Sequence, residues 1–259
     1  MFIPGMLNIW LWGKISNPIP IQHEMFKELV KNSVKVPSPA TDRLCAAARK
    51  AHAFVVMGIC ELDTLFSGTV YLTQLFISDT GEIMGVHRKM VPTREEKLVF
   101  SNGDSVTCTL LILLMANVRF RMRGANSLYK YALLAMGTQI HVASWPSNPR
   151  NLFPRSMLDT IDFRVRQFAH EGKIFVINSC GVTDEQNIEA CCNTQEEEND
   201  IVVGSGDGSS IIGPNGEHLA GPMYEGEGIL TAEISGRLPS GQAVAQRYGP
   251  LHAMGYLFT

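Results

Sequence analysis

The order of apolar segments constrains the fold of this chain more than any other feature of its sequence. Phe54–Cys60 is a continuous apolar run, which is typical of a strand buried on both faces, and Ile174–Asn178 predicts a second buried strand. Between them, Met157–His170 has apolar residues at helical spacing and is followed by Gly172. Helices that alternate with buried strands predict an α/β fold with helical layers around a mixed sheet. No repeat or linker divides the chain, so we predict a single domain over residues 1–259.

The other segments fit the same alternation. Helices are predicted for Pro18–Ser33, for Arg43–His52 with a cap at Thr41 and Asp42, and for Ser127–Met136. Strands are predicted for Val70–Ile77, Ile83–Val86 and Gln139–Ala143, and a late hairpin for Ser209–Ile212 with Gly228–Ile234 around the turn Gly213–Gly216. Hairpins are therefore expected among the helix-linked strands.

Composition and charge exclude several classes of partner. The formal net charge of −3 gives no electrostatic basis for binding nucleic acid or an anionic membrane. The longest apolar run, Val106–Val118, is too short for a membrane span, and Met1–Gly13 lacks the features of a signal peptide. The 6 cysteines show no Cys-x-x-Cys spacing, so we expect neither a zinc site nor a disulfide framework. No set of metal ligands is visible, and we expect no metal and no cofactor. We expect a cytoplasmic protein.

The stretch His87–Lys97 combines four cations and two carboxylates around Pro92, directly after a predicted strand. Such a stretch delivers charged side chains to the edge of a sheet, where active sites of α/β proteins are commonly built. A solvated charge run that closes a hairpin is the alternative, and composition alone favours it.

A series of short motifs runs through the chain in a fixed order. The motifs are Phe2–Gly5, Trp12–Ser16, Val36–Thr41, Leu75–Ile77, His87–Thr93, Glu96–Val99, Ala125–Leu133, Ala143–Pro146, Ile211–Gly216 and Glu225–Leu230. Together they resemble the nitrilases of the carbon–nitrogen hydrolase superfamily. The resemblance covers most of residues 2–104 and 125–234, whereas residues 105–124 and 235–259 diverge from it.

The resemblance implies an α-β-β-α sandwich, here missing its first strand, helix and strand, and an enzyme that converts a nitrile to a carboxylic acid and ammonia. The family uses a Cys nucleophile, a Glu general base, a Lys that stabilises the tetrahedral intermediate, and often a second Glu. A nitrile carbon is a poor electrophile, so the attacking sulfur must be a thiolate. The resemblance places Lys89 at the position of the family's lysine and Glu96 at that of the second glutamate, so we predict these two as catalytic residues.

The other two members of the set have no match in the sequence. The family's general base lies just before the segment that matches Phe2–Gly5, and the chain begins at Met1. Residues 119–124 read Arg-Phe-Arg-Met-Arg-Gly where the family has its Cys and a Glu two residues later. We interpret 105–124 as a local change of reading frame. Cys180 fits a family segment near the pocket, and Cys108 is predicted to be a buried, inert thiol.

Two functions are left open by these departures. The chain is either a nitrilase-like hydrolase, impaired or inactive, that acts on a small-molecule nitrile, or a non-catalytic homologue that assembles with full-length nitrilases. A homo-oligomer is expected from the resemblance, although residues 235–259 do not follow the family's C-terminal pattern. The sequence does not decide between aliphatic nitriles, aromatic nitriles and cyanide.

Overall fold

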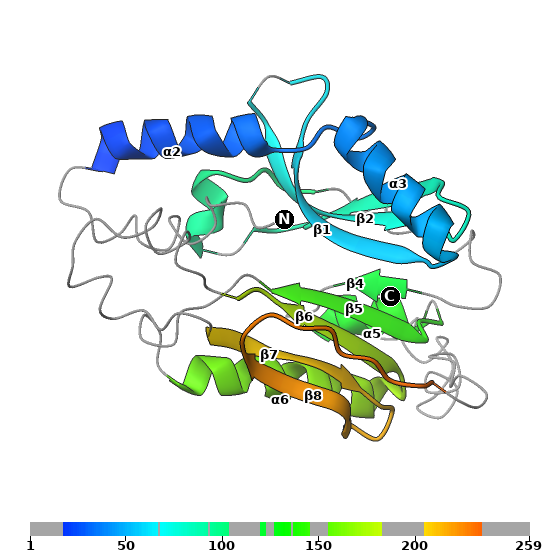
Figure 1. Ribbon diagram of the computed structural model, residues 1–259. Helices are drawn as coiled ribbons and strands as arrows, with labels where there is room; N and C mark the ends of the chain where they lie inside the picture. Colours follow the sequence, from blue (N-terminus) through cyan, green and yellow to red (C-terminus); the bar gives the residue numbers. More distant parts are fainter. Residues whose placement is uncertain are drawn as a thin grey trace, which may run out of the picture. The chain divides into compact units, whose positions relative to one another are not determined.

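The computed structural model describes residues 18–66, 68–92, 94–103, 120–122, 127–135, 137–145, 155–182 and 205–234. The chain divides into two compact units. The first consists of Met1–Leu114 with Gln186–Asn193, and the second of Met115–Glu185 with Thr194–Thr259. Each unit holds one sheet and the helices that pack on it (Figure 1). The prediction of a single domain stays a prediction.

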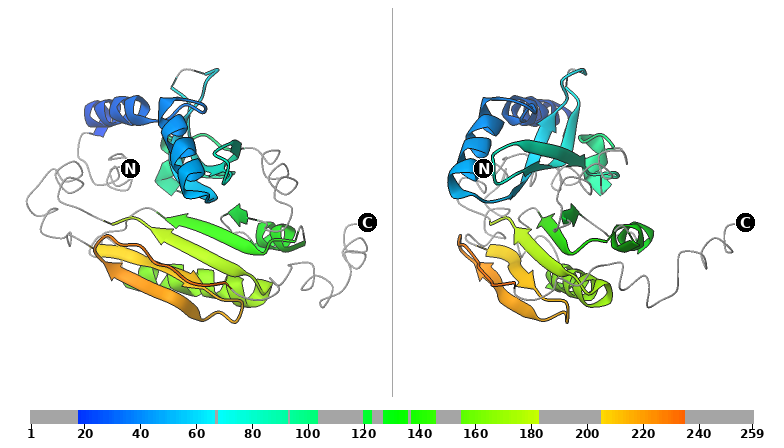
Figure 2. Two further views of the ribbon diagram at one scale, coloured as in Figure 1. Left: turned by 45° about the vertical axis from the view of Figure 1, so that its right-hand side comes forward. Right: turned by 90° about the vertical axis from the view of Figure 1, so that its right-hand side faces the viewer.

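The first unit contains a three-stranded antiparallel sheet in the order β1-β2-β3. Its strands are β1 (Val55–Leu62), β2 (Val70–Ile77) and β3 (Ile83–Arg88). The central strand β2 is the most buried of the three, because it has a neighbour on each side. Leu75 and Ile77 of β2 are almost completely buried and pack with Ala48 of helix α3 (Pro39–Ala51), which lies against the sheet (Figure 2).

Helix α3 is held in place at both ends. Its N-cap is Ser38, whose backbone N–H donates to the Thr41 Oγ1 at 2.8 Å, and proline at the first helical position supplies the helical φ. At the other end the hairpin turn between β2 and β3 docks on the helix: Arg49 Nε donates to the Thr80 carbonyl at 2.8 Å. A Cβ on Gly81 would lie 2.4 Å from the Cys45 carbonyl oxygen, so only glycine allows this approach.

Helix α2 (Pro18–Asn32) packs against the first unit through a stripe of apolar side chains. Leu29 is 3% exposed and forms a cluster with Cys60, Val70 and Phe100. The opposite side of the helix carries exposed ion pairs three residues apart, such as Lys27 with Glu24. This pattern is that of an amphipathic surface helix.

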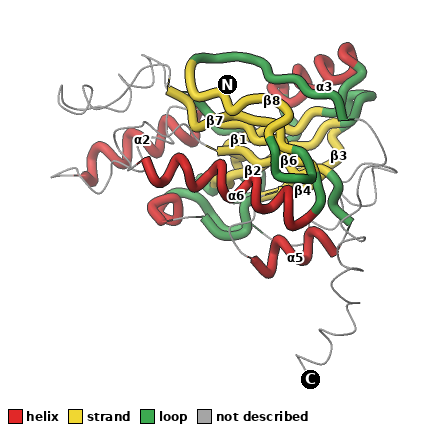
Figure 3. The backbone as a smooth tube through the Cα atoms, turned by 90° about the horizontal axis from the view of Figure 1, so that it is seen from below, coloured by secondary structure: helices red, strands yellow, loops and turns green. Residues whose placement is uncertain are grey.

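The second unit contains a five-stranded mixed sheet in the order β4-β5-β6-β7-β8. Its elements are β4 (Phe120–Met122), α5 (Ser127–Ala135), β5 (Ile140–Trp145), α6 (Arg155–Gly172), β6 (Phe175–Cys180), β7 (Ser205–Ile212) and β8 (His218–Glu225). Strands β4, β5 and β6 are parallel because helices connect them, and β6, β7 and β8 are antiparallel. Helix α6 lies along the sheet (Figure 3) and buries Val165, Phe168 and Ala169 against Val176 and Ile212.

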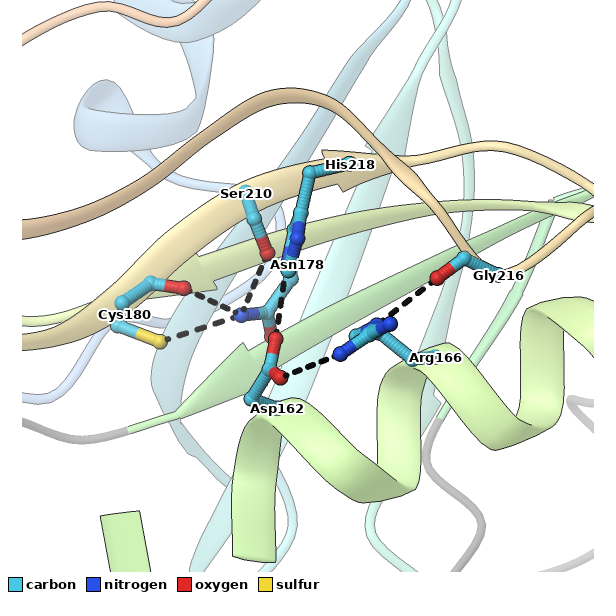
Figure 4. Close-up of polar contacts among 8 residues, drawn as sticks. Asp162, Arg166, Asn178, Cys180, Ser210, Gly216 and His218 are labelled. Carbon is cyan, nitrogen blue, oxygen red and sulfur yellow. Dashed lines mark hydrogen bonds and ion pairs between the residues drawn. The ribbon is translucent and has the colours of Figure 1, made fainter. Parts of the chain in front are cut away.

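Polar contacts fix α6 to the last hairpin. Asp162 lies 2.7 Å from His218 Nε2, and Arg166 Nε donates to the Gly216 carbonyl at 2.8 Å (Figure 4). Inside the sheet, the buried Asn178 Nδ2 donates to the Gly208 carbonyl at 3.0 Å. The first two contacts fix the position of α6 relative to the last hairpin, and the bond of Asn178 joins β6 to β7.

The predicted helices and most of the predicted strands are confirmed, with shifts of a few residues at their ends. The late hairpin was predicted with the wrong second strand: it is His218–Glu225, and Gly228–Ile234 carries no strand. The reason is the tight turn, in which Gly213 N–H donates to the Glu217 carbonyl at 2.9 Å and returns the chain at once.

Two finer expectations for the first unit were also wrong. Strand β1 is not buried on both faces, because most of its residues are only partly buried and Gly58 is exposed. Helix α3 begins before the expected cap at Thr41 and Asp42, because Pro39 is accommodated in its first turn. Within the residues that the structure describes, no helix has both the length and the apolar character that crossing a membrane requires.

Replacement of Leu75 by alanine is expected to destabilise the protein by about 3 kcal/mol, because it opens a cavity at the centre of β2. Leu65 offers a matched control, since its side chain is 85% exposed and Leu65→Ala removes the same atoms from the surface. Urea denaturation followed by circular dichroism measures both variants. Equal unfolding free energies for the two would contradict this account of the core.

Candidate active site

The candidate site begins where β3 ends. Side chains alternate along a strand, so His87 and Lys89 lie on one face of the sheet and Arg88 on the other. Lys89 continues the pairing by one residue, because its backbone N–H donates to the Leu72 carbonyl at 2.7 Å. His87 is paired with Gln74 of β2, and both side chains are buried. Lys89 therefore lies two residues beyond a cross-strand pair of buried polar side chains, His87 and Gln74.

The structure brings Lys89 and Glu96 together in an ion pair. Both side chains are largely removed from water, with exposed fractions of 12% for Lys89 and 4% for Glu96. Glu96 lies in the short 3₁₀ helix η2 (Arg94–Leu98), and its carbonyl accepts the N–H groups of Val99 and Phe100. The solvated charge run that composition favoured is thus wrong for this pair, because two isolated charges are too costly to bury and pairing offsets much of that cost.

The segment that carries both residues is closed by backbone hydrogen bonds. Gly103 N–H donates to the Lys89 carbonyl at 2.9 Å, and Ser101 N–H donates to the Val70 carbonyl at 2.9 Å. Phe100 is 3% exposed and forms an isolated parallel bridge with Val70. The end of this segment at Gly103 therefore lies next to its start at Lys89, and the ion pair joins that start to Glu96 in between.

A second ion pair lies on the opposite face of the same strand. Arg88 makes a two-pronged contact with Glu61, from Nε to Oε2 at 3.0 Å and from Nη2 to Oε1 at 2.6 Å. Thr73 Oγ1 also donates to Glu61 at 2.7 Å, so this carboxylate joins all three strands. The guanidinium stacks over Tyr71, with 4.0 Å to the ring centroid. The hydrogen bonds that Arg88 donates to Glu61 raise the pKa of Arg88 above its ordinary value.

Asp63 completes this charged cluster. Its Oδ1 accepts the backbone N–H of Leu65 at 2.7 Å and of Phe66 at 3.0 Å, and Arg88 lies 3.8 Å from Oδ2. The bond from Phe66, followed by that from Leu65, holds the pKa of Asp63 below its ordinary value of 3.8. The carboxylate organises the turn between β1 and β2.

Two of the described cysteines, Cys60 in the first unit and Cys180 in the second, differ in their surroundings. Burial raises the pKa of Cys60 to about 12, and the charge of Glu96 acts in the same direction. A thiol in this state is not a nucleophile at neutral pH. Cys180 ends β6 in the second unit, where its Sγ accepts a hydrogen bond from Asn178 Nδ2 at 3.5 Å (Figure 4).

Sequence reasoning predicted Lys89 and Glu96, which the structure brings together, but did not single out Glu61 or Gly103. The signal for Glu61 was a carboxylate at the end of an apolar strand, where an unpaired charge would be costly. Gly103 gave no signal apart from being a glycine after a polar loop. Cys108 lies outside the described residues, as does most of 105–124. Within that range the structure describes Phe120–Met122, which forms β4.

The chain matches a known family over nearly its full length. The family model of carbon–nitrogen hydrolases covers residues 1–240. The chain belongs to the carbon–nitrogen hydrolase family. It is 34% identical over 246 residues to an aliphatic nitrilase of Rhodococcus rhodochrous, covering 90% of this chain and 63% of the relative. It is 31% identical over 217 residues to nitrilase 1 of Arabidopsis thaliana, covering 81% of this chain and 59% of that protein.

The fold is shared with solved carbon–nitrogen hydrolases. The crystal structure of such a hydrolase from Helicobacter pylori G27 aligns with a TM-score of 0.63 at 19% identity, covering 96% of this chain and 80% of that one. The expected α/β class, an α-β-β-α sandwich of the carbon–nitrogen hydrolase type, is confirmed by this likeness. The chain spans about three fifths of the length of the curated relatives that it matches. The absence of a first strand, helix and strand stays a prediction.

Cys60 is expected to resist alkylation at neutral pH, because its thiol is buried and stays protonated. Native protein treated with iodoacetamide at pH 7.5 should leave Cys60 unmodified while Cys45, which is half-buried, reacts first. In urea both should react at similar rates. Peptide mass spectrometry measures the modification, and rapid labelling of native Cys60 would contradict the assignment.

Asp63→Asn is expected to destabilise the protein at neutral pH and to lose this effect in acid. A carboxyl whose folded pKa is lowered contributes stability that is present above its unfolded pKa and is lost as pH falls through the folded value. The difference in unfolding free energy between wild type and variant should be full at pH 7 and shrink below the ordinary pKa of 3.8. Urea denaturation from pH 7 to pH 2.5 checks this, and a difference independent of pH would contradict it.

Proposed function

We propose that this protein is a nitrilase-type hydrolase whose substrate is a small nitrile, with Lys89 and Glu96 as catalytic residues. The observation that carries the proposal is the buried Lys89–Glu96 pair at the end of β3, within a chain of the carbon–nitrogen hydrolase family. The relatives from Rhodococcus rhodochrous and Arabidopsis thaliana are nitrilases, which supports a nitrile as the substrate.

The pair suits the electrostatic demands of this reaction. Attack of a thiolate on the nitrile carbon places negative charge on the nitrogen, which then takes up a proton to give a thioimidate. Water adds to the thioimidate, ammonia leaves, and a second water molecule releases the carboxylic acid. A buried ammonium that is already oriented stabilises the negative charge of each addition step without reorganising. Lys89 supplies that charge, and Glu96 holds it in position.

We further propose that the chain with this sequence is impaired in the reaction. Residues 119–124 read Arg-Phe-Arg-Met-Arg-Gly, so no thiol stands where the family's nucleophile is expected. The described thiol of Cys60 is protonated, with its pKa raised to about 12. Removing a nucleophile from such a set typically reduces kcat by several orders of magnitude.

The same observation favours a second candidate function, a non-catalytic homologue that assembles with full-length nitrilases. Such a protein needs the family's fold and surfaces and has no need of the nucleophile. Copurification with a full-length nitrilase expressed in the same cells separates this candidate from an enzyme that acts alone. Size-exclusion chromatography with light scattering reports whether copies of the chain assemble with one another.

Lys89→Ala is expected to reduce nitrile turnover by about a factor of 10³, because the charge that stabilises the tetrahedral intermediates is lost. Ammonia release from a panel of aliphatic nitriles, aromatic nitriles and cyanide measures the activity of purified protein. Lys50→Ala is the matched control, since Lys50 is exposed on α3. Turnover that survives Lys89→Ala would contradict the assignment of this residue.

Absence of turnover in the wild type would favour the non-catalytic candidate for this chain. Sequencing of the transcript across codons 105–124 then tests the reading-frame hypothesis. If the frame is shifted, the protein with the restored frame should gain ammonia release that Lys89→Ala abolishes. An intact frame in independent clones would contradict the hypothesis.

A further inference from the structure

The carboxyl end of β3 is fixed from outside the candidate active site. We propose that Glu61 and Gly103 are positioning residues that hold Lys89 in its pairing with Glu96. Their relevance to catalysis rests on the proposed function, whereas the positioning itself is a property of the fold.

The first half of the argument is the fork between Arg88 and Glu61. Consecutive residues of a strand point to opposite faces, so the direction of Lys89 is set once the direction of Arg88 is fixed. Arg88 is held by two hydrogen bonds to Glu61, a geometry that restricts the guanidinium plane as well as its distance. Glu61 is itself fixed by Thr73 at 2.7 Å, in the strand between them. The carboxylate therefore anchors the end of β3 to β1 and β2.

The second half is the close approach of Gly103. A Cβ at this position would lie 2.4 Å from the Arg88 carbonyl oxygen and 2.7 Å from the Arg88 carbonyl carbon. Both are backbone atoms, so any larger residue would push the segment and the strand apart. The close approach also allows Gly103 N–H to donate to the Lys89 carbonyl at 2.9 Å. Gly103 thus closes the loop that brings Glu96 back to Lys89.

If Glu61 and Gly103 only stabilised the fold and had no influence on Lys89, their contacts would be the same. The reactivity of Lys89 distinguishes this case from a positioning role. Reductive methylation with formaldehyde and a borane, read by peptide mass spectrometry, reports how accessible each amine is. In the wild type, Lys89 should react much more slowly than Lys50, because its side chain is only 12% exposed. Glu96→Gln removes the partner and gives the upper limit of the Lys89 rate.

Glu61→Gln and Gly103→Ala should each raise the methylation rate of Lys89 by about fivefold, which lies within the effects expected for coupled neighbours. The rate of Lys50 should not change. Cys60 lies in the same sheet and is buried, so its alkylation reports any general opening of the unit and should stay slow.

Two control variants account for loss of stability alone. Leu75→Ala destabilises the same sheet from its centre, and Gly68→Ala replaces a glycine that has a φ of +80° and no atom within 4 Å of its Cβ position. Both should leave the Lys89 rate unchanged. The proposal is overturned if Glu61→Gln and Gly103→Ala leave Lys89 as unreactive as in the wild type, or if Lys89 and Cys60 become reactive together. Because methylation needs no turnover, this outcome is independent of whether the protein hydrolyses nitriles.

Discussion

Two adjacent cations at the end of β3 impose the central constraint on the first unit. Arg88 and Lys89 point to opposite faces of the sheet, and their side chains are only 23% and 12% exposed, so each face must provide a carboxylate. Glu61 satisfies Arg88 from the first strand, and Glu96 satisfies Lys89 from a loop that follows the strand. Removing one partner of such a pair leaves a buried, uncompensated charge, which costs about 3 kcal/mol or more. The placement of β1, β2 and the loop therefore depends on these two pairs.

The two pairs differ in what they can do. In the Arg88–Glu61 pair, the carboxylate accepts two hydrogen bonds from Arg88 and one from Thr73. This pair therefore stabilises the sheet. The Lys89–Glu96 pair lies at the end of a strand, within a loop closed by Gly103. An ammonium held in this way is already oriented when charge develops next to it, which is the condition for electrostatic catalysis. Under the proposed function, the end of this strand thus supplies both a structural cation, Arg88, and a catalytic one, Lys89.

The second unit is organised mainly by apolar packing and neutral hydrogen bonds. Helix α6 buries Val165 and Phe168 against the sheet, and the buried Asn178 joins β6 to β7 through the Gly208 carbonyl. Of its described ion pairs, Arg166 with Asp162 lies within α6, and Asp162 with His218 joins the helix to the start of β8. Changes of charge in this unit are therefore expected to act on the docking of α6, whereas in the first unit they act on the candidate site.

The sequence by itself determined the element types, the α/β class and the family, because apolar periodicity and short motifs are local properties that survive without tertiary contacts. It also singled out Lys89 and Glu96, through motifs that resemble those of the family. Only the tertiary structure decided that β8 is His218–Glu225, because the tight turn at Gly213 sets where the strand begins. It alone brought Glu61 to Arg88 across 27 positions of sequence, since strand register determines which charges meet. A pairing between distant charges is invisible in a sequence until the sheet is formed.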